Sequence, residues 1–298
     1  MRKSLRPRQK KRTNTLRIFI PIDGSERSLN AVRYVAAQPA FLGDDPEICL
    51  FVALEAPSAR IMTAFNPQTE DEFYREEAAG VFRLVDDIFP NRSDKVTVTY
   101  GVGPIAETIV KAADAYKADF VIIGTTGKGS FDGLLLGSVS QEVVHESHRP
   151  ILLIREEVPS ILPMDYLAIA VDDSDQSRRV LAFMQAHMDH FKTGAQFDLI
   201  HVEKATADKP EGTVETSPFV SGTVGALLES TLQHAGMKTT TVTVYGEPGE
   251  SIATYCEQRP IDMILMGSHG YSMLVASLVG STALSVETLC ETPLFLVR

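Results

Sequence analysis

The chain contains one sequence pattern twice, and this internal repeat limits the possible folds more than any other feature. An apolar run ends at Asp23-Gly24-Ser25 in the first half, and a similar run ends at Asp172-Asp173-Ser174 in the second. Three further segments recur in the same order: residues 99–101 match 244–246, 121–124 match 264–267, and 149–154 match 292–297. The offset falls from 149 to 145 to 143 residues, as length changes in loops would produce. The repeat therefore predicts a duplicated domain.

Each copy alternates short apolar runs, rich in β-branched residues, with segments of helical periodicity. The runs predict strands near 16–23, 47–54, 95–102, 120–125 and 151–155 in the first copy, and near 165–172, 196–203, 238–246, 262–268 and 294–298 in the second. Helical patterns lie between the strands, near 25–38, 69–89, 104–117 and 138–147 in the first copy. Because the strands are too apolar to leave one face in water, they predict parallel sheets covered by helices.

We therefore expect an α/β fold of two tandem doubly wound domains, each a five-stranded parallel sheet with helices on both faces. The first domain is predicted at 14–155 and the second at 164–298. A linker is predicted at 156–163, where the sequence has two prolines and a charge pair. Sheets of this kind bind ligands at the carboxyl ends of their strands.

Charge is unevenly distributed along the chain. The net charge is −11, but residues 1–12 hold seven cations and no acid, so the rest of the chain carries −18. An acidic body argues against nucleic acid as the main partner of the folded part. We interpret residues 1–13 as a basic, disordered, solubilising tail, and leave open that this tail contacts RNA, an anionic membrane or an acidic partner.

Three further features indicate a cytoplasmic protein. No stretch of about 18 uninterrupted apolar residues occurs, so no membrane span is expected. The basic tail has no apolar segment behind it, unlike a secretory signal. The three cysteines, Cys49, Cys256 and Cys290, lie far apart without a Cys-x-x-Cys pair, which fits a reducing compartment.

Glycine-rich loops follow the fourth predicted strand of each copy. Gly124-Thr125-Thr126-Gly127 is followed after nine residues by Gly137-Ser138, and Gly267-Ser268-His269-Gly270 is followed at the same spacing by Gly280-Ser281. A glycine at a strand end permits close backbone approach, and the N–H groups that open the next helix favour an anion. Ser138 and Ser140 add hydroxyl donors, and Lys128 adds a cation. A Gly-Ser pair also suits plain helix capping, but two copies with one spacing favour a phosphate site.

An aspartate ends the first predicted strand of each copy. Asp23 and Asp172 would lie beside the glycine loops, where a carboxylate accepts hydrogen bonds from ribose hydroxyls. The alternative is that each aspartate caps the following helix. Because Ser25 and Ser174 are better placed as caps, we favour the ribose role.

The Asp-x-Ser after the first strand and the G-x2-G-x9-G-[S/T] pattern after the fourth together resemble the universal stress protein family, in a tandem form. The resemblance covers nearly all of residues 14–298, and 134–140 read like the nucleotide-binding members almost letter for letter. It implies ATP, with or without Mg²⁺, in the crevice between strands one and four. It also implies that the final strands pair, so we expect the two domains to dock as an intrachain pseudo-dimer that is able to form a homodimer.

The resemblance assigns a role to individual residues. Asp23 would hold the ribose, and the backbone around Val52 would meet the adenine. Gly124 and Gly127 would line the path of the ribose and phosphates. The phosphates themselves would lie on the start of the next helix, at Gly137, Ser138, Val139 and Ser140. The implied positions in the second copy are Asp172, Val202, Gly267, Gly270, Gly280, Ser281 and Thr282.

The second copy departs from this pattern in two ways. Ala283 stands at the position of Ser140, which removes a hydroxyl donor. The nine-residue loop 271–279 has no cation, whereas Lys128 lies in the corresponding loop of the first copy. Because a charge-assisted hydrogen bond contributes about 1.5–3 kcal/mol, we expect tighter nucleotide binding in the first domain.

The sequence favours a regulatory nucleotide-binding protein with an unknown protein partner over an enzyme. No Walker A lysine, HxGH loop or SGGxDS loop is present. A nucleotide-independent scaffold and a slow ATPase or autokinase are the alternatives. His145 with His148 and His187 with His190 have the spacing of some metal sites, but apart from Asp189 they lack nearby acids or cysteines, so no metal is expected. The polar segments 69–89 and 203–218 are interpreted as solvated faces, with surfaces for a protein partner as the alternative.

Overall fold

The computed structural model describes residues 15–37, 42, 46–56, 67–89, 95–125, 137–155, 164–268 and 280–298. In the first domain, strands alternate with helices along the chain: β1 (Arg17–Pro21), α1 (Glu26–Ala36), β2 (Glu47–Leu54), α3 (Pro67–Asp86), β3 (Val96–Val102), α4 (Ile105–Tyr116), β4 (Phe120–Gly124), α5 (Ser138–Glu146) and β5 (Ile151–Ile154). The five strands are parallel and lie in the order β3-β2-β1-β4-β5. This is the doubly wound arrangement that the sequence predicts.

The second domain repeats the arrangement with β6 (Tyr166–Ala170), α6 (Asp175–His187), the short 3-10 helix η2 (Met188–His190), β7 (Gln196–Glu203), β8 (Val214–Thr216), α7 (Val224–His234), β9 (Lys238–Tyr245), α8 (Pro248–Glu257), β10 (Met263–Gly267), α9 (Ser281–Leu289) and β11 (Leu294–Val297). Its five parallel strands follow the same order, β9-β7-β6-β10-β11. The prediction of two tandem α/β domains is confirmed.

Strand β8 is an addition that the sequence analysis does not predict. It pairs antiparallel with β9 at the edge of the sheet, with Val214 opposite Val244. The segment is polar and only three residues long, so it shows no strand periodicity of its own. Tertiary contacts hold it instead: the Lys209 ammonium donates to the Glu215 carboxylate on β8 and, at 2.9 Å, to the Tyr245 hydroxyl on β9. The second sheet therefore has six strands, five of them parallel.

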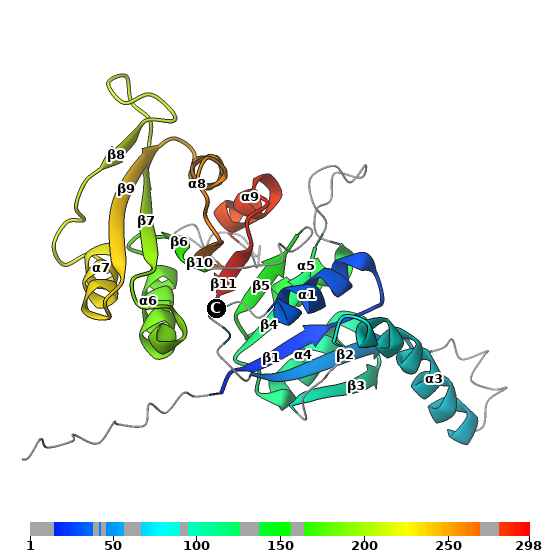
Figure 1. The fold of residues 1–298 in the computed structure, drawn as a ribbon. Coiled ribbons are helices and arrows are strands. Elements are labelled where there is room, and N and C mark those ends of the chain that lie inside the picture. The colour runs from blue at the N-terminus through cyan, green and yellow to red at the C-terminus, as the bar shows by residue number, and fades with distance from the viewer. Residues whose placement is uncertain are drawn as a thin grey trace, which may run out of the picture.

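The two sheets join edge to edge into one sheet of eleven strands (Figure 1). Strands β5 and β11 pair antiparallel, and Leu152 lies opposite Phe295. These two residues occupy the same position in their repeats, so a pseudo-two-fold axis passes between them, as in the isologous contact of a symmetric dimer. The final strands that the sequence analysis expects to pair are thus adjacent in the structure.

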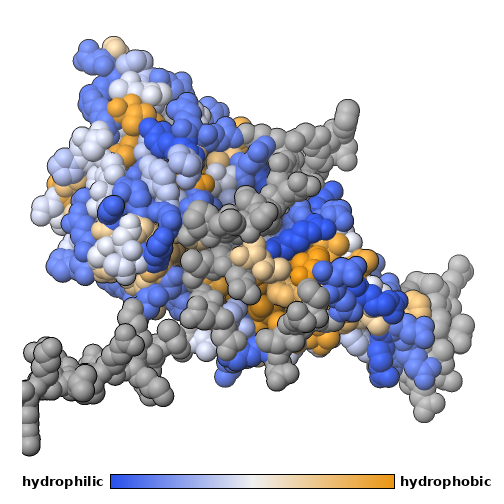
Figure 2. Space-filling model, viewed as in Figure 1, coloured by the Kyte–Doolittle hydropathy of each residue, from blue (hydrophilic) through white to orange (hydrophobic). Residues whose placement is uncertain are grey.

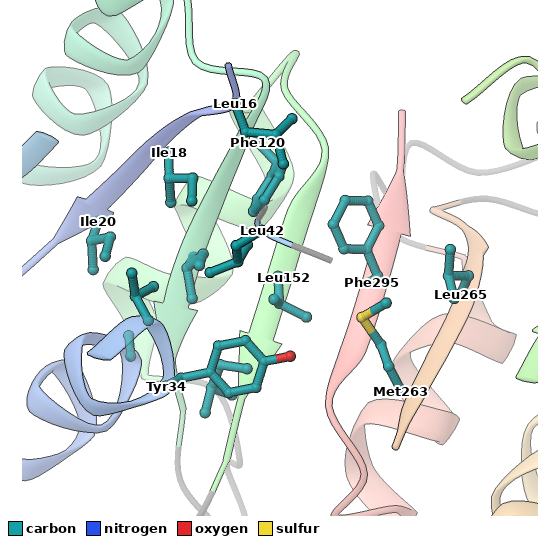
Figure 3. Close-up of a cluster of buried hydrophobic side chains, with 14 of the residues drawn as sticks. Leu16, Ile18, Ile20, Tyr34, Leu42, Phe120, Leu152, Met263, Leu265 and Phe295 are labelled. Atoms are coloured by element: carbon teal, nitrogen blue, oxygen red, sulfur yellow. The ribbon is translucent and has the colours of Figure 1, made fainter. Parts of the chain in front are cut away.

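Helices cover both faces of the joined sheet. Buried side chains of α1, α3, α6 and α7 form the core on one face, and those of α4, α5, α8 and α9 form the core on the other. The first core is continuous across the junction, where the rings of Phe120 and Phe295 pack edge to face with centroids 5.4 Å apart (Figure 3). Both domains therefore contribute to one hydrophobic core.

The surface differs between the two halves. In the view of Figure 2 the second domain is mainly hydrophilic, whereas a hydrophobic area is visible on the first domain. Among the described residues, no helix combines the length and apolarity that crossing a membrane requires.

Candidate functional site

The strand order brings the predicted loops together at one point in each domain. In the first domain, β1 lies between β2 and β4. The chain leaves β1 toward β2 but leaves β4 toward β5, so the carboxyl ends of β1 and β4 form the topological switch point where doubly wound sheets bind ligands. Asp23 follows β1 at this point and Gly124 ends β4, as Asp172 follows β6 and Gly267 ends β10.

Gly124 and Gly267 have a packing role that the sequence analysis does not assign. A Cβ atom on Gly124 would overlap the carbonyl oxygen of Arg27 in the first turn of α1. A Cβ atom on Gly267 would lie 2.5 Å from the Cβ of Gln176 in α6. Each glycine therefore lets the helix after the first strand pack directly against the end of the fourth strand.

The helices that follow the glycine loops begin without a side-chain cap. The N-cap of α5 is Gly137 and that of α9 is Gly280, and neither helix has an acid in its first turn. By contrast, the hydroxyls of Ser25, Ser174 and Thr223 cap α1, α6 and α7. Because Ser138 and Ser281 are the first helical residues, neither acts as the cap that a Gly-Ser pair suggests. The first N–H groups of α5 and α9 are thus left for water or an anion.

Arg27 is a neighbour of this helix start that the sequence analysis misses. Its Nη1 atom lies 3.6 Å from the place of a Cβ on Gly137. In the second domain the same position holds Gln176, whose Oε1 is buried without a hydrogen-bond partner among the described residues. The signal was present in the sequence, because both residues stand four positions after the aspartate of the repeat. Only the fold shows that this position faces the start of α5.

Among the described residues, hydrogen bonds reach only one of the two oxygens of the Asp23 carboxylate. Its Oδ1 accepts the Ser25 N–H at 2.9 Å, and its own N–H donates to the Ser28 hydroxyl at 3.2 Å. Burial alone would raise the pKa of Asp23, but hydrogen bonding, chiefly from Ser25, outweighs this effect and lowers the pKa below its usual 3.8. Asp23 is therefore an exposed, ionised hydrogen-bond acceptor at the switch point.

Asp172 is more firmly held than Asp23. Its Oδ1 accepts the Ser174 N–H at 3.1 Å, the Ser174 hydroxyl, and the Ser177 hydroxyl at 2.7 Å. One of the three bonds is present because Ser177 turns its hydroxyl to the carboxylate, whereas the equivalent Ser28 donates to the Ser25 carbonyl at 3.0 Å. The aspartate of the second domain thus stabilises its own loop.

The registers of β2 and β7 correct one predicted correspondence between residues of the two copies. The Ile22 N–H donates to the Phe51 carbonyl at 2.8 Å, and the Val171 N–H donates to the Ile200 carbonyl at 2.9 Å. Val52 therefore corresponds to His201, and Val202 corresponds to Ala53, so pairing Val52 with Val202 is wrong by one residue. Since side chains alternate along a strand, this error exchanges the two faces of the sheet.

The side chains confirm that register. Val52 is buried in the core against α1 and α3. His201 lies on the equivalent face, with its Nδ1 3.2 Å from the Val171 carbonyl and its ring beside Phe219. Val202 packs against the opposite core. His201 therefore packs on this face of the sheet, between the Val171 carbonyl and Phe219.

The remaining predicted residues divide between the start of α5, the start of α9 and segments that the structure does not describe. Ser138 and Val139 are exposed on the first turn of α5, with Ser140 half-buried behind them. On α9, Ser281 is exposed, Thr282 is half-buried, and the Gly280 N–H donates to the Ser268 carbonyl at 2.8 Å. Gly127, Lys128 and Gly270 lie outside the described residues.

The histidine pairs do not form metal sites in the part of the chain that is described. No group of three or more His, Cys, Asp or Glu side chains there comes together in a way that could hold a metal ion. His148 lies 3.6 Å from Asp114, and its side chain is 82% exposed. His187 and His190 instead line an apolar pocket with Phe120, Phe183 and Phe295. The second pair is thus part of the contact between the domains.

Comparisons with known proteins agree on one family. The model of the universal stress protein family matches residues 15–155 and again 165–298. A universal stress protein of Mycobacterium tuberculosis is 25% identical over 96% of this chain and 97% of its own length. One from Methanocaldococcus jannaschii is 38% identical over 47% of this chain and 95% of its own length. The crystal structure of a universal stress protein from Archaeoglobus fulgidus has the same fold, with a TM-score of 0.69, 24% identity and coverage of 95% and 96%.

Proposed function

The chain belongs to the universal stress protein family, and on that premise we propose that its first domain binds ATP at the carboxyl ends of β1 and β4. The observation that carries the proposal is the start of α5. The helix has neither a side-chain cap nor an acid in its first turn, and its first N–H groups open at the topological switch point of the sheet. A helix start of this kind is a ready site for phosphate.

We propose a partner in the first domain for each part of the nucleotide. The exposed carboxylate of Asp23 is an acceptor for ribose hydroxyls. The backbone at the end of β2, around Val52 and Ala53, is the nearest edge for the adenine, since β2 is the neighbour of β1. Ser138, Val139 and Ser140 would hold the phosphates through the first turn of α5. Gly127 and Lys128 complete the proposed site from the loop before α5.

Two contacts support a preference for the first domain. Asp172 already accepts three hydrogen bonds on Oδ1, so a ribose would compete with its own loop. The Gly280 N–H donates to the Ser268 carbonyl, whereas the Gly137 N–H has no such bond among the described residues. A nucleotide in the second domain would therefore displace existing hydrogen bonds, each of which contributes about 0.5–1.5 kcal/mol net.

We propose that the bound nucleotide acts by changing which partner the protein contacts. The pairing of β5 with β11 leaves neither of these strands as a free edge for a second copy. A homodimer or another protein partner would therefore use a different surface from the one that joins the two domains.

Isothermal titration with ATP, with and without Mg²⁺, tests the proposal. We expect one tight site in the wild-type protein and its loss in Gly137→Val, because the added side chain blocks the approach to the first turn of α5. The matched variant Gly280→Val should keep the tight site. Far-ultraviolet circular dichroism verifies that both variants fold.

Absence of heat with the wild-type protein, together with absence of co-purified nucleotide by mass spectrometry, would overturn the proposal and favour a nucleotide-independent scaffold. Incubation with γ-labelled ATP separates a binder from a slow ATPase or autokinase. Release of labelled phosphate or label on the protein would show an enzyme.

A further inference from the structure

We infer that Arg27 makes the first domain selective for a nucleoside triphosphate, and that Gln176 leaves the second domain suited to a nucleotide with fewer phosphate charges. The inference rests on the proposed nucleotide site and adds the residue that distinguishes ligands there. It starts from one position of the repeat, which carries a cation in the first domain and an amide in the second.

The backbone of Arg27 is fixed by its packing. Its carbonyl oxygen occupies the space that a side chain on Gly124 would fill, so the first turn of α1 lies directly against the end of β4. From this anchor the side chain reaches the start of α5, with Nη1 3.6 Å from the place of a Cβ on Gly137. Arg27 thus spans the two ends of the proposed phosphate path.

The charge of Arg27 is not used elsewhere in the described structure. Neither a hydrogen bond nor an ion pair joins its guanidinium to another described residue. Arg33 on the same helix differs, since its Nη1 donates to Glu26 at 2.9 Å and to Asn30 at 2.6 Å. A free guanidinium beside a helix N-terminus adds a full positive charge to the partial charge of the dipole, and its fork of donors matches phosphate oxygens.

The second domain lacks this charge. Gln176 lies against Gly267 as Arg27 lies against Gly124, but its side chain is neutral. The adjoining loop 271–279 has no cation in its sequence. Asp173 adds a negative charge where the first domain has Gly24, and its carboxylate accepts the Val224 N–H at 3.0 Å. A triphosphate in the second domain would therefore lack the charge that Arg27 supplies in the first.

The test is titration of the full chain with ATP and AMP at low and high salt. We expect Arg27→Gln to weaken ATP binding about tenfold, which is the effect of about 1.4 kcal/mol, and to change AMP binding less than about threefold. The ATP effect should shrink at high salt because the contact is exposed and screened. Gln176→Arg should strengthen ATP binding at the second site by a similar factor.

Arg33→Gln is the matched control, because it removes an arginine of α1 that points to Glu26, and it should leave both affinities unchanged. Equal weakening of ATP and AMP, or unchanged ATP binding in Arg27→Gln, would overturn the inference while wild-type binding stands. Failure of the wild-type protein to bind any nucleotide would instead overturn the proposed function. Circular dichroism of each variant separates lost contacts from misfolding.

Discussion

The Arg155 guanidinium at the end of β5 donates to the Glu287 carboxylate on α9, with 2.8 Å between Nη2 and Oε1, and so links the two domains. Its Nη1 also donates to the Cys290 carbonyl at 2.7 Å. Both charged side chains are only 3% exposed. The position of Glu287 in the first domain is Val144, so this ion pair occurs on one side of the pseudo-two-fold axis only.

Removing Glu287 should therefore destabilise the protein strongly. In Glu287→Ala the Arg155 guanidinium stays buried without its partner, and we expect a loss of about 3–5 kcal/mol in the free energy of unfolding. Urea denaturation measures the loss. Glu107→Ala is the control, because the Glu107–Lys111 pair is exposed and should contribute less than about 1 kcal/mol. Equal losses in the two variants would show that the interdomain pair is not a structural link.

Gly124→Ala should destabilise the first domain even in the absence of any ligand. The new Cβ overlaps the Arg27 carbonyl, so α1 has to move away from β4, at a cost of about 1–3 kcal/mol or more. Gly80→Ala is the matched control. Gly80 lies within α3, where a Cβ finds only the end of the Arg83 side chain at 3.7 Å, so we expect a gain of about 0.5–1 kcal/mol. Thermal unfolding compares the two, and a neutral Gly124→Ala would contradict the packing role.

The strands were predictable because they are buried on both faces, as the burial of all four residues of β5 and of β11 shows. Strand β8 was not, since a strand of three residues within a polar segment has no periodicity of its own and depends on pairing with β9. The pairing of β5 with β11 was expected only through the family resemblance, and its antiparallel direction was not predicted. The residues of β5 and β11 do not by themselves specify that the partner of each strand is the other.

The candidate site could be predicted from the sequence where a single motif contains both residues, as the glycine motif contains Gly124 and Gly137. It could not be predicted where the two residues are far apart in sequence. Arg27 meets the start of α5 more than 100 residues later, which only the crossover of the chain determines. The pairing of Val52 with Val202 failed for a related reason, because register depends on the neighbouring strand and not on the similarity of two valines.

Asp23→Ala should mainly weaken ATP binding, whereas Asp172→Ala should mainly reduce the stability of the fold. Asp172 accepts three hydrogen bonds within its own loop, so its removal should cost about 2–3 kcal/mol of stability. The exposed Asp23 accepts the Ser25 N–H, and its removal should cost about 1 kcal/mol but weaken ATP binding. Urea denaturation and titration calorimetry on the same samples separate the two effects. Greater destabilisation by Asp23→Ala would contradict the assigned roles.

The contact between the domains should weaken in mild acid. His187 and His190 line the apolar pocket at the junction together with Phe120 of the first domain. Burial lowers the pKa of both histidines below 6.5. The negative charge of Asp119 partly opposes this effect on each histidine, and Asp189 also opposes it on His190. In mild acid the folded protein therefore binds fewer protons than the unfolded chain. The stability that the neutral histidine rings contribute is complete above pH 6.5. It is lost as the pH falls from 6.5 through the lower pKa values of the folded state.

We expect the free energy of unfolding to fall between pH 7.5 and about pH 5, by at most about 1.4 kcal/mol per pH unit for each histidine. The double variant His187→Leu with His190→Leu should flatten this slope, because it removes both titrating groups without burying an unpaired amide. His148→Gln is the control, since that side chain is 82% exposed and touches no part of the junction. Urea denaturation at several pH values between 5 and 7.5 measures this slope for the wild-type protein and the variants. An unchanged slope in the double variant would place the acid sensitivity elsewhere in the chain.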